Sequence, residues 1–346
     1  MKKLFTLGLV LLATMVLAVA CAGADGGSDF SAGMVTDQSG VNDQSFNQSS
    51  WDGLLRLRDS IGATIGYLES ATPADKEPNM DRFLDMDKDI IWVIGFLGAE
   101  PVTHQALINP SQTYGIIDYY FGDNILPNVV AVDFMDNEAT FMAGYLAARH
   151  SNTGVVGFMG GMEFPVIHRF EVGFVAGVAY ANHVHGLDVE VLVQYIGDFD
   201  STTIARGISM SMHAQGADVL YAAAGAAGQG AIDFAVENDI YVIGVDLEQS
   251  HLAPNNMIIS TLKHVGEAIY DVSLRLSQGE NVGGQNLVYG IAQGAVGITP
   301  FEGSTAALVD PAVHADALAI GSRIARGNLE VPVNHDQLGV FINSLQ

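Results

Sequence analysis

The sequence of 346 residues contains a single cysteine, Cys21. One thiol excludes an intramolecular disulfide, and it also excludes a zinc site built from several thiolates. Basic residues are scarce as well, with 14 Lys and Arg against 39 Asp and Glu, which gives a formal net charge of −25. Nucleic acids and anionic membrane surfaces repel so acidic a chain, so neither is an expected partner.

No stop-transfer stretch follows Cys21, and the long apolar run of the chain lies at its N-terminus. Lys2 and Lys3 precede apolar residues 4–20, which end in small side chains directly before Cys21. A basic start, an apolar middle and a small-residue cleavage site predict a secretory signal peptide over residues 1–20. The alternative is a membrane-spanning helix, which is less favoured because both lysines lie on the same side of the run.

The position of Cys21 predicts a lipid anchor. The run from Leu17 to Cys21 resembles a bacterial lipobox, with Ala18 where the usual leucine stands and Leu17 one place earlier. Two or three acyl chains hold a protein at a bilayer far more firmly than one chain does. Residues 21–29 are small and polar, and we expect them to form a lipidated flexible tether. The mature protein is therefore expected at the cell membrane, on its extracytoplasmic side (periplasmic or outer surface).

Cleavage makes the chain more acidic. Removing residues 1–20 removes two lysines and no acid, which changes the formal charge from −25 to −27. Such a charge favours solubility and is consistent with the absence of a nucleic-acid partner.

Short apolar runs alternate with amphipathic stretches along the rest of the chain. Nine runs rich in Val, Ile, Leu and Ala are expected to be buried strands: 32–36, 90–94, 114–117, 129–132, 155–159, 190–195, 219–223, 241–245 and 257–261. Six stretches between them are expected to be helices: 43–59, 137–149, 169–183, 202–215, 228–238 and 265–278. This alternation predicts an α/β fold with parallel sheets and right-handed crossovers.

The length of the mature chain, roughly 320 residues, exceeds a single ordinary core and predicts two domains. The first set of elements ends near residues 150–154, and a further strand at 287–291 and a helix near 311–326 follow the second set. We expect an N-terminal α/β domain of residues 30–150 plus about 266–297. We expect a C-terminal α/β domain of residues 151–265 plus about 298–346. Repeated crossing between domains would give a multi-strand hinge.

Polar and aromatic side chains gather where the predicted strands end, which is where parallel sheets bind ligands. The candidates are Asp37, Phe46, Asn47, Asp118, Phe199, Gly225, Asp246 and Lys263. Carboxylates accept hydrogen bonds from sugar hydroxyls and ring N–H groups, and aromatic side chains stack on flat rings. Plainer explanations exist, since Asp37, Asn42 or Asp43 is expected to cap the first helix and Phe46 is also suited to a core. The joint position of these residues at strand exits favours a binding site.

Several longer stretches resemble the basic membrane protein family of lipoproteins. They are MVTDQSGVNDQSFNQ at 34–48 with WDG at 51–53, GFMGGMEFPVI at 157–167 with RFE at 169–171, DVLYAAAG at 218–225, VIGVD at 242–246 with Gln249, and STLK at 260–263. The resemblance extends from about residue 33 to residue 298. It implies a type I periplasmic-binding-protein fold, in which two Rossmann-like parallel-sheet domains are joined by a multi-strand hinge.

The family resemblance also implies a function and a set of ligand contacts. Its members are substrate-binding subunits of ABC transporters, so a purine nucleoside (adenosine, guanosine or inosine) is expected in the interdomain cleft. The expected partners are the permease and ATPase subunits of an importer and, through Cys21, the lipid bilayer. The resemblance assigns the purine ring to Phe46 and Phe199, the base edge to Asp37 and Asp118, the ribose to Asp246 and Lys263, and secondary contacts to Asn47 and Gly225. No cofactor, no metal and no catalytic residue are expected, and the protein is expected to be a monomer.

Two positions depart from the family pattern, and two other functions stay open. His168 stands where many relatives have a basic residue, and Asn42 replaces a frequent aspartate, so Asn42 is expected to cap or orient rather than bind. One alternative is a binding protein of the same fold for riboflavin or a sugar. The other is a nucleoside hydrolase-like enzyme, which is disfavoured because the 37–43 stretch has only Asp37 and Asp43 as acids for a metal.

Overall fold

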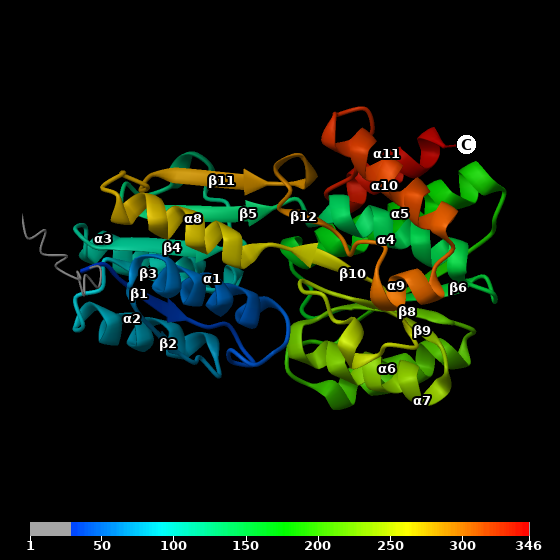
Figure 1. Ribbon diagram of the computed structural model, residues 1–346, viewed down its shortest axis with the longest axis horizontal. Helices are drawn as coiled ribbons and strands as arrows, with labels where there is room; N and C mark the ends of the chain where they lie inside the picture. Colours follow the sequence, from blue (N-terminus) through cyan, green and yellow to red (C-terminus); the bar gives the residue numbers. More distant parts are fainter. Residues whose placement is uncertain (1–28, 346) are drawn as a thin grey trace, which may run out of the picture.

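The computed structural model describes residues 29–345. The predicted signal peptide, Cys21 and the tether up to residue 28 lie outside the described residues. The strands within them form two six-stranded sheets, which lie side by side along the long axis of the molecule (Figure 1). Helices are interleaved with the strands along the chain, which confirms the predicted α/β class.

The first sheet has the strand order β11-β5-β4-β3-β1-β2, and every neighbouring pair is parallel. Its strands are β1 (Ser31–Val35), β2 (Thr64–Leu68), β3 (Ile90–Val93), β4 (Thr113–Ile117), β5 (Val129–Phe134) and β11 (Gln285–Tyr289). Helices α1 (Phe46–Ile61) and α8 (Val265–Ser277) cover one face, and α2 (Lys76–Leu84) and α3 (Ala99–Ile108) cover the other. Helices on both faces explain why β3 and β5 are buried along their whole length.

The second sheet has the strand order β12-β10-β9-β8-β6-β7. Its strands are β6 (Val155–Gly160), β7 (Glu190–Tyr195), β8 (Val219–Ala223), β9 (Tyr241–Gly244), β10 (Met257–Lys263) and β12 (Val296–Ile298). One face carries α4 (Asp136–His150), α5 (Pro165–His185), α9 (Gly303–Leu308), α10 (Pro311–Ala325) and α11 (His335–Ser344). The other face carries α6 (Thr202–Ala214) and α7 (Gln229–Asn238). The short strand β12 pairs antiparallel with β10, which departs from the all-parallel expectation.

Helices α4 and α5 approach each other closely because glycines lie at their contact. A Cβ atom at Gly144 would be 2.0 Å from the carbonyl oxygen of Phe174, and one at Gly177 would be 2.0 Å from that of Phe141. Side chains of both helices join the core of the second sheet. The prediction that residues 136–150 belong to the first domain is therefore corrected, since α4 packs on α5 and on the second sheet.

The chain passes between the two sheets three times. It leaves the first sheet after Phe134, returns between Lys263 and Val265, and passes again to the second sheet between Tyr289 and Val296. Three segments therefore cross between the two halves of the molecule, each of which is built on one sheet. Helix α8 and strand β11 complete the first half from the C-terminal part of the chain.

Two kinds of element were not predicted from the sequence. Strand β2 lies at the edge of its sheet and is largely exposed or half-buried, so it lacks the apolar run of a buried strand. The short strand β12 and helices α2, α3, α9 and α11 were also not predicted. Within residues 29–345, no helix is both long enough and apolar enough to cross a membrane.

Candidate ligand-binding site

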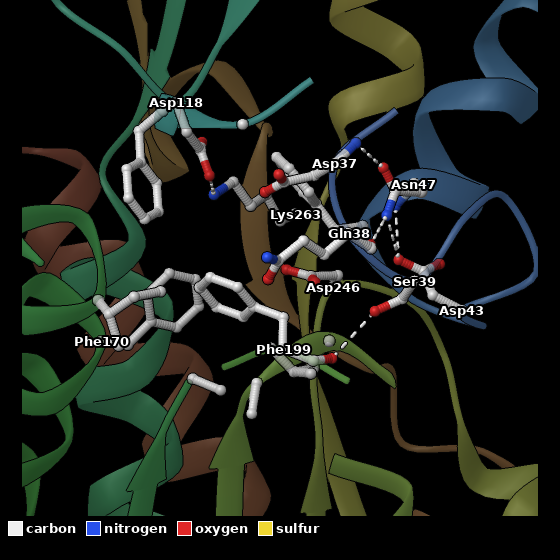
Figure 2. Close-up of a pocket in the computed structure, with 18 residues that line it drawn as sticks. Asp37, Gln38, Ser39, Asp43, Asn47, Asp118, Phe170, Phe199, Asp246 and Lys263 are labelled. Carbon is white, nitrogen blue, oxygen red and sulfur yellow. Dashed lines mark hydrogen bonds and ion pairs between the residues drawn. The ribbon is translucent and has the colours of Figure 1, made fainter. Parts of the chain in front are cut away.

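A cavity lies between the two halves, where loops that follow the strands of both sheets meet (Figure 2). The space between the residues that line it, including its opening to solvent, is about 530 Å³. The eight residues predicted to bind the ligand all line this cavity: Asp37, Phe46, Asn47, Asp118, Phe199, Gly225, Asp246 and Lys263. The structure therefore brings together residues that are up to 226 positions apart, since Asp37 and Lys263 lie at the two ends of the set.

Asp37 enters the cavity shortly after the end of β1. Its side chain is buried, and Oδ1 of the carboxylate lies 3.1 Å from Nζ of Lys76, the first residue of α2. Burying a carboxylate is unfavourable unless a partner offsets the lost hydration. Lys76 supplies that partner, although the sequence analysis did not place it near the site.

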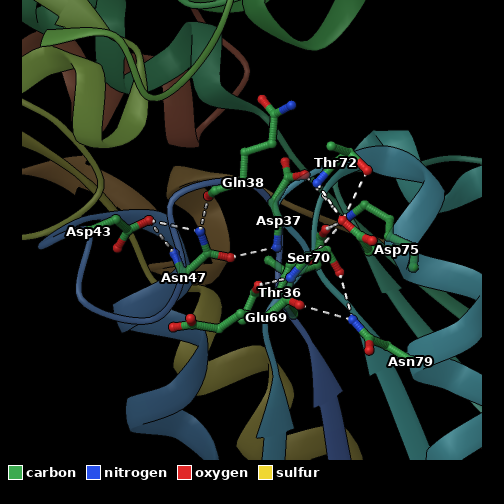
Figure 3. Close-up of polar contacts among 12 residues, drawn as sticks. Thr36, Asp37, Gln38, Asp43, Asn47, Glu69, Ser70, Thr72, Asp75 and Asn79 are labelled. Atoms are coloured by element: carbon green, nitrogen blue, oxygen red, sulfur yellow. Dashed lines mark hydrogen bonds and ion pairs between the residues drawn. The ribbon is translucent and has the colours of Figure 1, made fainter.

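Asn47, at the start of α1, holds the loop that follows β1 (Figure 3). Its Oδ1 accepts a hydrogen bond of 2.8 Å from the backbone N–H of Asp37, and its Nδ2 donates to the carbonyl oxygen of Gln38 at 2.9 Å. Both ends of the amide therefore hold the loop that presents Asp37. The predicted contact between Asn47 and a ligand stays a prediction, and the observed bonds give Asn47 a role in orienting this loop.

Asp43 caps helix α1. Its carboxylate accepts hydrogen bonds from the backbone N–H groups of Ser45 (3.0 Å), Asn47 (2.8 Å) and Gln48 (3.0 Å). These are the free N–H groups that a helix leaves at its start, and a carboxylate there also interacts favourably with the helix dipole. Of the three candidate caps, the structure assigns this role to Asp43, while Asn42 is exposed and does not line the cavity.

Lys263 lies at the centre of a buried charge cluster. Its Nζ is 2.7 Å from Oδ1 of Asp118 and 3.1 Å from Oδ1 of Asp136. Burial favours the neutral amine, yet the neighbouring carboxylates outweigh this effect and raise the pKa of Lys263 above its ordinary value. The ammonium also lies 5.2 Å from the ring centres of Phe46, Phe134 and Phe170, which is within cation–π distance.

The ion pairs of Lys263 within the protein join it to Asp118 and Asp136. The assignment of Lys263 and Asp246 to the ribose stays a prediction. Asp246 accepts a hydrogen bond of 2.6 Å from Oγ of Ser45, which precedes α1. Burial raises the pKa of Asp246 to about 6, and the nearby Lys263 partly offsets this rise.

Asp118 and Asp246 share an unusual backbone conformation. Both follow a strand and both have a φ of +65°, in the left-handed region. Aspartate enters this region more readily than most residues, but the conformation still costs free energy and is concentrated at functional sites. The turn at each residue directs its carboxylate into the cavity. The two residues with this unfavourable backbone conformation are therefore also residues of the site.

Aromatic rings form another part of the cavity wall. Phe96, which begins the short helical turn after β3, lies 6.3 Å from the ring of Phe199 and 4.8 Å from that of Phe164. A Cβ atom at Gly161 would lie 2.3 Å from the Phe199 ring, so glycine is required there to admit it. Phe96 and Phe170 also line the cavity and were not predicted.

Polar contacts join the two halves around the cavity. Besides the Ser45–Asp246 and Lys263–Asp118 contacts, Oγ of Ser39 donates to the carbonyl oxygen of Phe199 at 3.0 Å. Nε2 of Gln249 donates to the carbonyl oxygen of Gln44 at 2.9 Å. The structure therefore shows the two halves in contact around the cavity, which lies between them.

Some residues of the site carried no recognisable signal in the sequence. Asp133 lies near the end of β5 and Asp136 begins α4, and the guanidinium of Arg169 lies 3.6 Å from Oδ2 of Asp136. His168, the other departure from the family pattern, contacts the rings of Tyr195 and His335 and does not line the cavity.

Among the described residues, no group of three or more His, Cys, Asp or Glu side chains is arranged to hold a metal ion.

Comparison with known solute-binding structures supports the same fold. The structure matches an ABC transporter solute-binding protein from Aeropyrum pernix with a TM-score of 0.83 and 25% sequence identity, over 91% of this chain and 97% of that one. It also matches an ABC transporter solute-binding protein from Conexibacter woesei with a TM-score of 0.69 and 21% identity, over 88% and 98% of the two chains. These matches confirm the periplasmic-binding-protein fold.

Sequence comparison identifies the family. Residues 30–335 match the family described as ABC transporter substrate-binding protein PnrA-like. The chain is 32% identical over 311 residues to basic membrane protein A of Borreliella afzelii, covering 87% of this chain and 91% of that protein. It is 30% identical over 334 residues to basic membrane protein D of Borreliella burgdorferi, covering 95% and 96%. The chain therefore belongs to the PnrA-like basic membrane protein family of ABC transporter substrate-binding proteins.

Proposed function

We propose that this protein binds a purine nucleoside in the cavity between its two halves and delivers it to the permease of an ABC importer. The observation that carries the proposal is the joint presence of three buried carboxylates and two aromatic rings around one cavity between the two halves. The carboxylates are those of Asp37, Asp118 and Asp246, and the rings are those of Phe46 and Phe199. In this proposal the protein is not an enzyme.

The chemistry of the cavity suits a nucleoside. Carboxylate oxygens accept hydrogen bonds from the N–H groups of a base and from the hydroxyls of ribose, and aromatic side chains stack on a flat base. A hydrogen bond to a charged group contributes about 1.5–3 kcal/mol, so two or three such bonds support strong binding. In the proposed arrangement, Asp37 and Asp118 hold the base, and Asp246 and Lys263 hold the ribose.

Closure of the two halves supplies the mechanism. The ligand would bind to one half first, and motion of the three crossing segments would bring the other half onto it. The hydrogen bonds from Ser39 and Ser45 to the opposite half would then hold the closed form. The permease and its ATPase subunits are proposed to recognise this closed form.

Calorimetric titration of residues 22–346 would test the ligand assignment. The ligands would be adenosine, guanosine, inosine, uridine, ribose, riboflavin and adenosine monophosphate. We expect binding of at least one purine nucleoside, and weaker or no binding of the monophosphate, because the cavity is lined by four carboxylates and one ammonium. Binding of ribose or riboflavin without any nucleoside would overturn the purine assignment. Release of free base from a bound nucleoside would favour the hydrolase alternative.

The anchor is proposed separately, because Cys21 lies outside the described residues. We propose that cleavage before Cys21 and acylation of its sulfur hold a monomeric protein on the extracytoplasmic side of the cell membrane. Mass spectrometry of protein purified from membranes would show the mass of the acyl chains on an N-terminal Cys21. A Cys21→Ala variant is expected in the soluble fraction, and its retention in the membrane would contradict the anchor.

A further inference from the structure

Lys76 is a buried charge that the proposed contacts do not use. The described chain has three lysines, Lys76, Lys88 and Lys263. Two of them are buried at the cavity or directly behind it, since Lys76 is 1% exposed and Lys263 is 3% exposed. An ammonium is retained in such a place only where partners satisfy it, because removing an unpaired charge from water is strongly unfavourable.

The hydrogen bonds of Lys76 all stay within the protein. Nζ donates to the carbonyl oxygens of Thr36 (3.0 Å) and Ile94 (2.8 Å), and it lies 3.1 Å from Oδ1 of Asp37. Thr36 and Ile94 directly follow β1 and β3, which are neighbouring strands of the first sheet. Two of the three ammonium protons are donated to these carbonyl oxygens, and the contact with Asp37 is an ion pair. Lys76 does not line the cavity, so it is not placed to donate to a ligand there.

Asp37 is held on its other side as well. A Cβ atom at Gly95 would lie 2.3 Å from Oδ2 of Asp37, so the carboxylate rests against a position that admits only glycine. Gly95 also has a φ of +87°, which other residues rarely adopt. The backbone N–H of Asp37 is bonded to Asn47 at 2.8 Å. The carboxylate is thus fixed between Lys76, Gly95 and the Asn47 loop.

We propose that Lys76 is a positioning residue, which holds the Asp37 carboxylate as an oriented acceptor for an N–H donor on the base of the ligand. Lys76 thereby favours ligands that carry such a donor over ligands of the same shape that lack it. The inference rests on the proposed nucleoside function. It adds to that function a residue that acts only through Asp37.

Two ligands distinguish this role from a general effect on folding. Inosine carries an N–H group on its six-membered ring, whereas purine riboside carries neither an N–H nor an amino group there. We expect Lys76→Met and Lys76→Gln to weaken inosine binding by about 10-fold or more, because the acceptor loses its fixed position. Purine riboside binding should change by less than about 2-fold. Lys88→Met is the matched control, since Lys88 lies outside the cavity, and it should change neither affinity.

The double variant Asp37→Asn/Lys76→Met tests the same point without leaving a lone buried charge. If Lys76 acts through Asp37, this variant should bind inosine no more weakly than Asp37→Asn alone. An equal loss for both ligands, or no loss for either, would overturn the role of Lys76 while leaving the nucleoside function intact. A wild-type protein that binds neither nucleoside would overturn the proposed function and this inference together.

Discussion

Oγ of Ser45 donates a hydrogen bond of 2.6 Å to Oδ2 of Asp246, and this bond joins the start of α1 in one half to the end of β9 in the other. Both side chains are buried. A bond between a hydroxyl and a carboxylate is stronger than one between neutral groups. The pair therefore connects the proposed ligand contact at Asp246 with closure of the cavity.

Replacing the donor should weaken closure. We expect Ser45→Ala to reduce ligand affinity by about 10-fold, because the buried Asp246 oxygen loses its partner in the closed form and the lost bond involves a charged group. Ser60→Ala is the control on the same helix, since Ser60 bonds only to the Leu57 carbonyl at the far end of α1. Titration calorimetry of both variants gives the comparison, and equal affinities would show that the bond does not support binding.

Asp136 should make stability depend on pH. Burial raises its pKa to about 7, even though Lys263 and Arg169 partly counter this rise. Between about pH 4 and pH 7, the Asp136 carboxyl is therefore protonated in the folded protein but already ionised in the unfolded chain. The free energy of unfolding from this group therefore falls as pH rises through that window, by at most about 1.4 kcal/mol per pH unit.

An Asp136→Asn variant tests this dependence. It cannot ionise, so its unfolding free energy should change less steeply with pH between 4 and 7 than that of the wild type. Urea unfolding at several pH values measures both curves. Parallel curves would show that Asp136 does not take up a proton on folding. Asp310→Asn is a control because that carboxylate caps α10 at the surface.

The contact between Phe96 and Phe164 should slow ligand release. The two rings lie 4.8 Å apart and come from opposite halves, since Phe96 follows β3 and Phe164 precedes α5. An aromatic pair contributes about 0.5–1.5 kcal/mol beyond its buried area. We expect Phe164→Ala to raise the dissociation rate by about 2- to 10-fold, measured by stopped-flow fluorescence. The exposed Leu318 gives a control, and a similar rate change in Leu318→Ala would contradict the assignment.

The glycines between α4 and α5 should be irreplaceable. An alanine at Gly177 would place its Cβ 2.0 Å from the Phe141 carbonyl oxygen. We expect Gly177→Ala to reduce the free energy of unfolding by about 1–3 kcal/mol, because the two helices must move apart. Gly207→Ala on α6 meets no atom within 4 Å, and it should instead raise stability by about 0.5–1 kcal/mol. Thermal or urea unfolding distinguishes these opposite signs.

The sequence pattern was sufficient to predict the buried strands and the polar residues that follow them. Continuous runs such as that of β5 identify strands covered on both faces, and the rule that ligands bind beyond the carboxyl ends points to Asp118 and Asp246. The placement of α4 was not accessible in the same way. The helix is buried around most of its surface, and its packing on α5 depends on the fit of Gly144 and Gly177, which the sequence pattern does not show.

The partners within the site were also beyond sequence reasoning. Lys76 lies 39 residues after Asp37, and nothing in the local pattern of α2 distinguishes a buried ammonium from an exposed one. Similarly, Asp136 pairs with Lys263 only because two of the crossing segments meet. Such pairs depend on tertiary geometry, which single-residue propensities do not record.

The threefold crossing of the chain has a consequence for the order of folding. Residues 29–134 supply five strands of the first sheet, but β5 is covered at its edge by β11, and α1 packs against α8. Half of the molecule therefore cannot complete its core until the chain has been made to about residue 289. Contacts this far apart in sequence form slowly, so the first half should complete its fold only after β11 has been made.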